Sequence, residues 1–288
     1  MFVVSGANGQ TGSVVAQTLL EKGLPVRVII REEKDAKNWT DLGAEAMVAD
    51  MQNADDVTKA LAGATGLYLM NPPAYDKPDM FAEEDKVIAA FQTAIAATPN
   101  LKRIVVLSSR GGQLSSGTGN ILTNHKLEEA FGNRENVTVV RAANFMENWK
   151  SVVPAVLEKG VLPTMFAPLD KKLPMVAARD IGRVCADSLV EDKNEFELKE
   201  LEGFDLSPND VAAAFSRALG KEIKAVPIPE SEWLGIFSHI SGSQKNAESF
   251  AEMTNAGNSG LLQWETDAAS RIKGTVTIDD FVRDVLKK

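Results

Sequence analysis

The sequence has 288 residues, 44% hydrophobic and 25% charged, with a formal net charge of −9, as expected for a globular protein with room for a main domain and a smaller lobe. The acidic balance argues against direct contact with nucleic acid or acidic membranes, and no apolar run approaches the length of a membrane span. A single cysteine excludes internal disulfides and favours a cytoplasmic location, and a strand at the very start leaves no room for a signal peptide.

The first twelve residues, MFVVSGANGQTG, combine a short apolar run with a glycine-rich turn. Phe2 to Val4 predict a buried strand, and a helix is predicted over 11–22. Between them Gly6 permits a sharp turn, Gly9 has no side chain to hold a phosphate off the backbone, and Gly12 permits close packing of the helix. Helix N-termini bind anions, so this strand–turn–helix predicts a dinucleotide site, with a merely structural turn as the alternative. The candidate cofactor-binding residues of this loop are Gly6, Asn8, Gly9, Gln10, Thr11 and Gly12.

A second strand is predicted over 25–30, and it ends at Arg31. This position lies about twenty residues after the glycines, where nucleotide folds place the residue that faces the adenosine ribose. An acid there bonds the 2′-hydroxyl of NAD, whereas an arginine pairs with the 2′-phosphate of NADP. Arg31 therefore favours NADP(H) over NAD(H). The alternative is a solvated surface arginine whose field Glu32 and Glu33 dilute.

Helices and strands continue to alternate up to about residue 153. Helices are predicted over 35–42, 55–61, 79–97 and 123–132, and strands over 44–48, 66–70, 103–107 and 137–141. This alternation predicts right-handed βαβ units and an α/β fold with a parallel sheet. We therefore assign 1–153 to the nucleotide-binding domain and 154–288 mainly to a C-terminal lobe, with segments free to return to the main sheet.

Several polar or rigid residues follow these strands, at the sheet edge where α/β folds bind ligands. Asp50 follows the third strand, Asn71 and Pro72 stop the fourth, and Ser108 follows the fifth. These four residues are further cofactor-binding candidates, although Ser108 can equally cap the backbone. Tyr75, just beyond the fourth strand, is a candidate substrate contact near the reacting end of the cofactor, with a rigid surface turn as the alternative.

Longer motifs accompany the glycine loop. They are SGANGQTG at 5–12, NPP at 71–73, RAANFMEN at 141–148, ARDI at 178–181, NAGNSGLL at 255–262 and TIDDFV at 277–282. Together with Arg31, this combination resembles the NmrA-like branch of the atypical short-chain dehydrogenase/reductases. The resemblance implies a Rossmann-type doubly wound parallel sheet, a smaller C-terminal α+β substrate lobe, a cleft between them, and NAD(P)H, usually NADPH. Members range from quinone and isoflavonoid reductases to redox-sensing regulators, so the resemblance fixes the cofactor better than the activity.

The family's usual Tyr-x-x-x-Lys motif is incomplete. Lys126 stands at the position of the lysine, but Leu122 stands where the proton-donating tyrosine belongs. A reduction must therefore take its proton from water, from Lys126 or from a residue outside the motif. Lys126 is a candidate for cofactor binding and catalysis, with a solvated helix lysine as the alternative. The two histidines, His125 and His239, show no metal-ligand spacing, so we expect no metal.

Two functions stay open from the sequence. The first is NADPH-dependent reduction of a quinone-like or other conjugated small molecule, the acceptor that least needs a dedicated acid. Phe145, Met146 and Trp149 are candidate apolar walls for it, or else a helix face packed on the core. The second function is a non-catalytic NADP(H) sensor acting through protein contacts, which the absent tyrosine favours. A homodimer is a candidate assembly, because dimers are common among soluble proteins.

Overall fold

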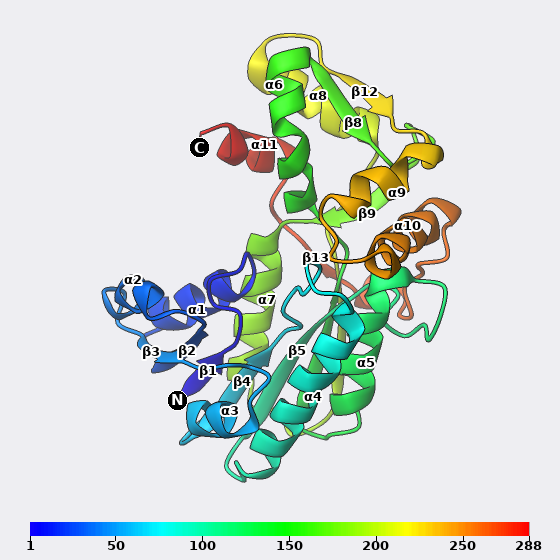
Figure 1. Cartoon of the computed structure of the whole chain (residues 1–288). Helices are drawn as coiled ribbons and strands as arrows, with labels where there is room; N and C mark the ends of the chain where they lie inside the picture. The colour runs from blue at the N-terminus through cyan, green and yellow to red at the C-terminus, as the bar shows by residue number, and fades with distance from the viewer. Residues whose placement is uncertain (288) are drawn as a thin grey trace.

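The computed structural model describes residues 1–287, and its largest element is an eight-stranded sheet (Figure 1). Its order is β13-β10-β6-β5-β4-β1-β2-β3, and each strand pair runs parallel. The strands are β1 (Phe2–Val4), β2 (Val26–Ile30), β3 (Glu45–Val48), β4 (Gly66–Leu69), β5 (Arg103–Ser109), β6 (Val137–Ala142), β10 (Glu197–Glu202) and β13 (Ile272–Lys273). The predicted α/β fold with a doubly wound parallel sheet is confirmed.

Both faces of this sheet are covered by helices, which is why its central strands are continuously apolar. Successive side chains of a strand point to opposite faces, so Val3 packs into one core layer and Val4 into the other. Helices α3 (Ala54–Leu61), α4 (Met80–Ala96) and α5 (Leu122–Phe131) cover the first face. Helices α1 (Gly12–Glu21), α2 (Ala36–Thr40) and α7 (Ala178–Val190) cover the second.

The chain reverses its direction across the sheet beside β1. From β1 it continues through β2 to β3 at one edge, and it then crosses back to β4 on the other side of β1. The carboxyl ends of β1 and β4 thus diverge into helices on opposite faces. Such a topological switch point opens a crevice, and it is where open α/β sheets bind their ligands. The glycine loop follows β1 at this point.

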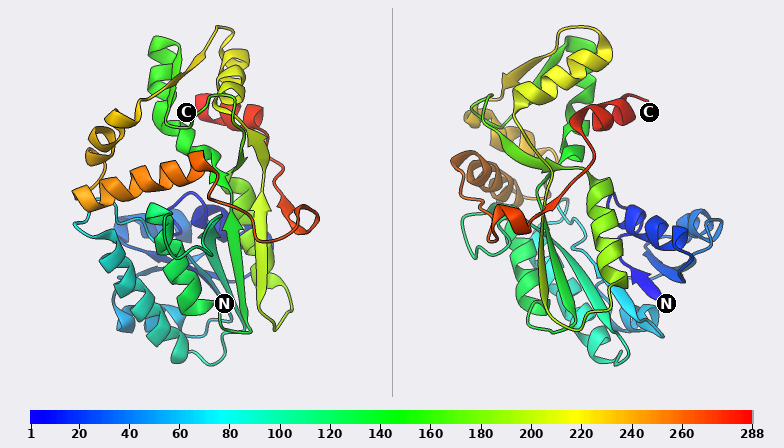
Figure 2. Two further views of the ribbon diagram at one scale, coloured as in Figure 1. Left: turned by 90° about the vertical axis from the view of Figure 1, so that its right-hand side faces the viewer. Right: turned by 180° about the vertical axis from the view of Figure 1, so that it is seen from behind.

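The C-terminal lobe lies above the carboxyl edge of the sheet (Figures 1 and 2). It holds two small sheets, β11-β9-β7 and β12-β8, around its own apolar core. The strands are β7 (Asn144–Phe145), β8 (Val161–Thr164), β9 (Leu173–Val176), β11 (Phe204–Leu206) and β12 (Lys224–Pro227). The helices are α6 (Val153–Lys159), α8 (Pro208–Leu219), α9 (Glu230–Ser238), α10 (Gln244–Ser259) and α11 (Ile278–Leu286).

The two parts of the chain interlock. Helix α7 packs on α1, and β10 and β13 extend the main sheet beyond β6, although all three follow residue 154. The predicted lobe ends at residue 288, which lies outside the described residues. Within residues 1–287 we find no helix that combines the length and apolar character needed to cross a membrane.

Candidate functional site

The glycine loop after β1 has the backbone geometry of an anion cradle. Gly6 has a φ of +62°, a conformation that favours glycine, and a Cβ at Gly12 would lie 2.3 Å from the Gly6 carbonyl oxygen. The Gly9 amide donates to that oxygen at 2.8 Å, while a Cβ at Gly9 would meet only the same oxygen, at 3.1 Å, with open space beyond. Gly6 and Gly12 are therefore required by the fold, whereas Gly9 keeps the space above the loop free.

Free backbone amides face this space. In the described part of the chain the amides of Gln10, Thr11 and Gly12 donate to no protein acceptor, as is usual for the first residues of a helix. They stand at the positive end of the α1 dipole, and Gln10 is exposed. A diphosphate placed here would satisfy donors that the protein leaves open, so the loop fits a dinucleotide cofactor.

Two side chains predicted to bind the cofactor anchor the loop instead. The Thr11 hydroxyl is buried and pairs with the Tyr68 hydroxyl of β4 at 2.9 Å. The side-chain nitrogen of Asn8 donates to Asp35 at 2.7 Å, and its side-chain oxygen accepts from the Trp39 indole at 2.8 Å. We therefore expect Thr11 to serve the cofactor through its backbone amide, and Asn8 to hold the loop against α2. No sequence pattern predicts these two anchors, because their partners lie far along the chain.

Arg31 stands exposed at the end of β2, on the same edge as the glycine loop. Within residues 1–287 its guanidinium forms neither a hydrogen bond nor an ion pair. The neighbouring acid that was expected to dilute its charge is engaged elsewhere, because Glu32 lies 2.6 Å from Lys34. That hydrogen bond to Lys34 lowers the pKa of the exposed Glu32. Arg31 thus has no ion-pair partner among the described residues where the adenosine ribose is expected, while the charges of Glu32 and Glu33 lie close along the chain.

The remaining strand-end candidates occupy the same edge with different exposure. Asp50 is exposed, and its carboxylate accepts from the Gln52 amide at 2.9 Å. Asn71 and Pro72 are half-buried directly after β4. Ser108 is buried, and its hydroxyl donates to the Glu128 carboxylate of α5. Ser108 therefore has a side-chain partner already, a role that sequence reasoning did not assign.

Glu84 of α4 is a buried acid beside the predicted site, and sequence reasoning missed it. It is 3% exposed, and neither carboxyl oxygen has a hydrogen-bond partner at regular geometry within the described residues. Burial raises the pKa of Glu84 to about 8, although Asn71, Lys126 and Thr123 all favour its charged form. Glu84 is therefore mostly protonated at pH 7. A sequence signal existed, since Met80, Glu84 and Val87 share the buried stripe of α4.

Lys126 lies near this acid on α5. Its ammonium pairs with Asp85 at 2.6 Å, and its side chain is 36% exposed. The pairing leaves Lys126 at the surface of the site with Glu84 behind it. Leu122, at the position of the family tyrosine, is the first residue of α5 and supplies no proton.

The four candidate substrate contacts fall into two groups. Tyr75 is 40% exposed, and its ring packs edge-on against Phe250 of α10, with centroids 4.8 Å apart. Phe145 is half-buried in β7. Met146 is fully buried in the lobe core, and the buried Trp149 indole donates to the Met175 sulfur at 3.3 Å. The prediction of apolar walls is thus wrong for Met146 and Trp149, whose side chains face the core because Met146–Val152 forms a short 3-10 helix packed on β9.

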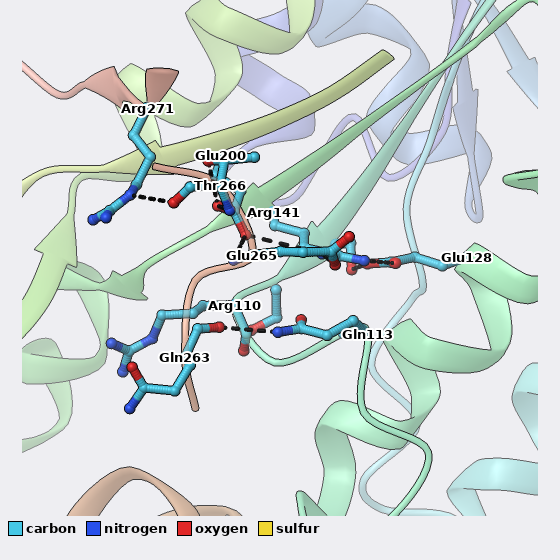
Figure 3. Close-up of polar contacts among 12 residues, drawn as sticks. Arg110, Gln113, Glu128, Arg141, Glu200, Gln263, Glu265, Thr266 and Arg271 are labelled. Atoms are coloured by element: carbon cyan, nitrogen blue, oxygen red, sulfur yellow. Dashed lines mark hydrogen bonds and ion pairs between the residues drawn. The ribbon is translucent and has the colours of Figure 1, made fainter. Parts of the chain in front are cut away.

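A buried network of charges joins the sheet edge to the 263–266 segment (Figure 3). Arg141 of β6 donates to both carboxylate oxygens of Glu128, at 2.9 and 2.6 Å, and to Glu265 at 2.6 Å. Burial alone would lower the pKa of Arg141, but Glu128 and Glu265 hold it above its usual value. Glu200 of β10 accepts from the Glu265 and Thr266 amides, at 2.9 and 2.8 Å. The network fixes Glu128, and with it Ser108.

Two hollows of the surface lie away from this edge. One is lined by α8 and β12, including Asn209 and Lys224, and the other lies between η3 (Met146–Val152), α7 and α11, including Glu147 and Asp284. Neither includes a residue of the glycine loop. The crevice beside β1, with its open amides, remains the better candidate site.

A parallel sheet with a glycine loop and a helix N-terminus at its switch point defines a dinucleotide-binding protein. A family model described as NAD(P)H-binding matches residues 6–192, and one described as the NmrA-like family matches residues 126–281. Each covers more than half of the chain. The chain therefore belongs to the NmrA-like family of NAD(P)H-binding proteins, as its motifs suggested.

Individual relatives agree with this assignment. The NAD(P)H azoreductase of Xenophilus azovorans is 28% identical over 232 residues, which are 79% of this chain and 77% of that protein. The NADPH complex of a quinone oxidoreductase from Escherichia coli superposes with a TM-score of 0.78 at 22% identity, covering 99% of this chain and 100% of that one. The triphenylmethane reductase of Citrobacter sp. superposes with a TM-score of 0.79 at 21% identity, covering 100% and 99%. The two structural likenesses, at these identities, describe the fold.

Proposed function

We propose that this protein is an NADPH-dependent reductase of a quinone-like or other conjugated small acceptor. One observation carries the proposal: the glycine loop at the switch point of the sheet leaves the amides of Gln10, Thr11 and Gly12 without a protein acceptor, as a dinucleotide cofactor requires. The similar proteins are named for reduction of azo compounds, quinones and triphenylmethane dyes. These are conjugated aromatic acceptors, which supports the same substrate class here.

Each part of the edge has its own task in this proposal. The amides of Gln10, Thr11 and Gly12 bind the pyrophosphate of the cofactor, and Arg31 pairs with its 2′-phosphate. NADPH, when bound, supplies the hydride. Asn71 and Ser108 border the nicotinamide end, and Tyr75 and Phe145 border the acceptor. The fold has to hold the acceptor near the nicotinamide and exclude water, which are positioning tasks.

The proton need not come from the missing tyrosine. A reduced quinone delocalises its charge, so it tolerates a distant or slow proton source. The structure offers a Glu84 carboxyl that holds its proton at pH 7, and the charge of Lys126 acts on it. We propose that Lys126 faces the cofactor and the acceptor while Glu84 is the nearby proton reserve.

The sensor alternative rests on Leu122. A protein that binds NADP(H) tightly but lacks the family's acid could report the redox state without turnover. The two functions differ in a measurement of NADPH oxidation against a panel that includes a naphthoquinone, an azo dye and a triphenylmethane dye. Turnover above the uncatalysed rate with at least one of them is expected. Tight NADPH binding with no turnover on any of them would overturn the reductase and favour the sensor.

A further inference from the structure

Arg110 is a deeply placed cation beside the candidate site, and in the described residues its side chain has no ion-pair partner. It directly follows β5, and its amide donates to the Ala142 carbonyl at the end of β6, at 2.9 Å. The residue is 8% exposed. Within residues 1–287 its guanidinium takes part in neither a hydrogen bond nor an ion pair. The guanidinium carbon lies over the Trp264 ring, 5.5 Å from its centroid.

The other buried arginines of the sheet show how unusual this is. Arg103 donates to Glu197 at 3.2 Å and to two backbone carbonyls, and Arg141 donates to Glu128 and Glu265. Arg110 has only the aromatic face, and such a contact is weaker than the cost of burying an unpaired ion. Burial lowers the pKa of Arg110 to about 10, with Asp205 opposing that effect through its charge. The guanidinium remains a cation at neutral pH with its donors unused.

An incoming group can reach these donors. Among the described residues, Arg103 has a nitrogen that is sealed from solvent and unpartnered, but no nitrogen of Arg110 is in that condition. Each unpartnered Arg110 nitrogen therefore keeps some contact with solvent. Figure 3 shows Arg110 beside Gln263, whose backbone carbonyl accepts from Gln113 at 3.0 Å. The guanidinium thus lies deep but open, between the end of β5 and the 263–266 segment.

The position excludes the cofactor's pyrophosphate as the natural partner. The glycine loop follows β1, and β4 lies between β1 and β5. Since neighbouring strands are about 4.8 Å apart, the end of β5 is roughly 10 Å from the end of β1. Arg110 also bonds toward β6, away from β1. It lies beyond Ser108, on the side where the acceptor rather than the diphosphate is expected.

We propose that Arg110 binds the carboxylate or sulfonate group of an aromatic acceptor, so that this protein selects anionic acceptors. The inference rests on the proposed reductase function for the identity of the ligand. A guanidinium with free donors recognises planar or tetrahedral oxyanions through paired hydrogen bonds. No group of the described residues competes for those donors.

The kinetic test uses two acceptors that differ only in the anionic group, 1,4-naphthoquinone and its 2-sulfonate. In Arg110→Gln we expect kcat/KM for the sulfonate to fall about 10- to 100-fold, mainly through KM, because a charge-assisted bond is worth about 1.5–3 kcal/mol. The kcat/KM for the neutral quinone should change by less than about twofold. Arg110→Lys should recover part of the loss, since lysine restores the positive charge but not the paired N–H donors of a guanidinium. Equal losses for both quinones would overturn the proposal.

Arg271 provides a matched control. Its guanidinium lies at the same 5.5 Å from the Trp264 ring, but it is paired with Glu202. Arg271→Gln removes a paired arginine from the same ring and leaves the unpaired Arg110 in place. The ratio of kcat/KM for the sulfonate to kcat/KM for the neutral quinone should therefore match that of the parent. If Arg271→Gln lowers the preference for the sulfonate as much as Arg110→Gln does, the effect is one of general charge, and the assignment to Arg110 is wrong.

A binding arm separates this inference from the proposed function. Naphthalene-2-sulfonate cannot be reduced by hydride transfer, and its binding to the NADP⁺-loaded protein can be titrated by calorimetry. We expect binding to the parent and its loss in Arg110→Gln, whether or not any quinone is turned over. Such binding without quinone turnover would disprove the proposed reductase function and still support the anion site. Absence of binding to the parent, or equal binding to both proteins, would overturn the anion site even if turnover is fast.

Discussion

Single charged residues in this protein differ mainly in whether a counter-charge lies beside them. Arg141 is enclosed by the carboxylates of Glu128 and Glu265, which makes it part of the scaffold. Arg31 and Arg110 have no such partner within residues 1–287, one at the surface and one in the interior. Unpaired cations of this kind cost stability when buried and attract anions when accessible, so these two positions are where ligands with negative groups are expected.

The glycine loop separates residues needed for folding from those needed for binding. Gly9→Val should nearly abolish NADPH binding with the protein still folded, because its side chain would enter the open space above the loop. Gly12→Val should instead destabilise or unfold the protein, since its Cβ would lie 2.3 Å from the Gly6 carbonyl oxygen. Fluorescence titration with NADPH and a thermal melt of each variant measure the two effects. Unchanged affinity in Gly9→Val would refute the phosphate-loop assignment.

Arg31 should decide the choice of cofactor. Arg31→Ala should raise the dissociation constant for NADPH about 10- to 100-fold and leave that for NADH almost unchanged, because only NADPH carries the 2′-phosphate. Added salt should weaken NADPH binding more than NADH binding. Lys37→Ala, which removes an exposed charge already paired with Asp41 at 2.8 Å, is the control for long-range effects. Equal losses for the two cofactors would mean that Arg31 supports the adenine pocket or the fold.

Glu84 should make stability depend on pH. Its pKa rises from the ordinary 4.5 to about 8 on folding, so the unfolded chain loses the proton first, and stability falls as the pH rises from about 4.5 to 8. One pKa unit corresponds to about 1.4 kcal/mol. The unfolding free energy of the parent should therefore fall by a few kcal/mol over this pH window, and that of Glu84→Gln should not. Lys126 and Asp85 are the neighbouring groups whose charges act on it.

Urea denaturation at pH 5 and pH 8 measures this difference. Glu83→Gln is the control, because Glu83 is on the same turn but is bonded to Lys86 and Gln52, which lower its pKa. The Glu83 variant should keep the pH dependence of the parent. If the difference in unfolding free energy between the parent and Glu84→Gln is the same at pH 5 and at pH 8, Glu84 is not neutral in the folded protein.

At the scale of helices and strands, the hydrophobic period of the sequence was sufficient for the main domain. Strands β1 to β6 and helices α1 to α5 lie within a few residues of their predicted ranges, because each buries a continuous apolar face. The alternation that identified them stops after residue 153, so the small sheets of the lobe and the return of β10 to the main sheet had no local signal. Their pairings join residues far apart, such as Glu197 with Thr138.

Side-chain direction was the weaker part of the prediction for the same reason. Met146 and Trp149 follow β6 at the ligand edge, but they enter the lobe core because the segment turns into a 3-10 helix against β9. Glu84 is the opposite case, because an ionisable residue lies within the apolar, buried stripe of α4. Such positions depend on tertiary packing that periodicity does not report.

Helix α7 should owe much of its attachment to one carboxylate. Asp180, in its first turn, accepts from the Thr275 amide and hydroxyl, both at 2.8 Å, and from the Val276 amide at 2.9 Å. Asp180→Ala should lower the free energy of unfolding by roughly 1–3 kcal/mol, since it leaves three donors unpaired, of which the Val276 amide is buried. Asp187→Ala, on the same helix but exposed and paired with Lys22, should change it by less than about 0.5 kcal/mol. Similar small losses in both variants, by urea denaturation, would contradict this role.

At the scale of the whole molecule, the lobe and the nucleotide-binding part form one interlocked unit. The loop after β4 docks on α10, where the Asn246 amide donates to the Tyr75 and Lys77 carbonyls at 3.2 and 2.7 Å. The charge network holds the 263–266 segment against β6 and β10. The proposed acceptor side is therefore built from segments more than a hundred residues apart, which is why sequence motifs identify the cofactor more readily than the acceptor.

The most direct test of the reductase assignment is a single-turnover experiment on the full-length protein. NADPH bound to excess protein is mixed anaerobically with 1,4-naphthoquinone, and the nicotinamide absorbance is followed by stopped flow. We predict that the parent protein oxidises its bound NADPH much faster than the two compounds react in buffer, and that Gly9→Val does not exceed the buffer rate. NADPH that stays reduced on the parent protein, or oxidation at the buffer rate with both proteins, would contradict the account.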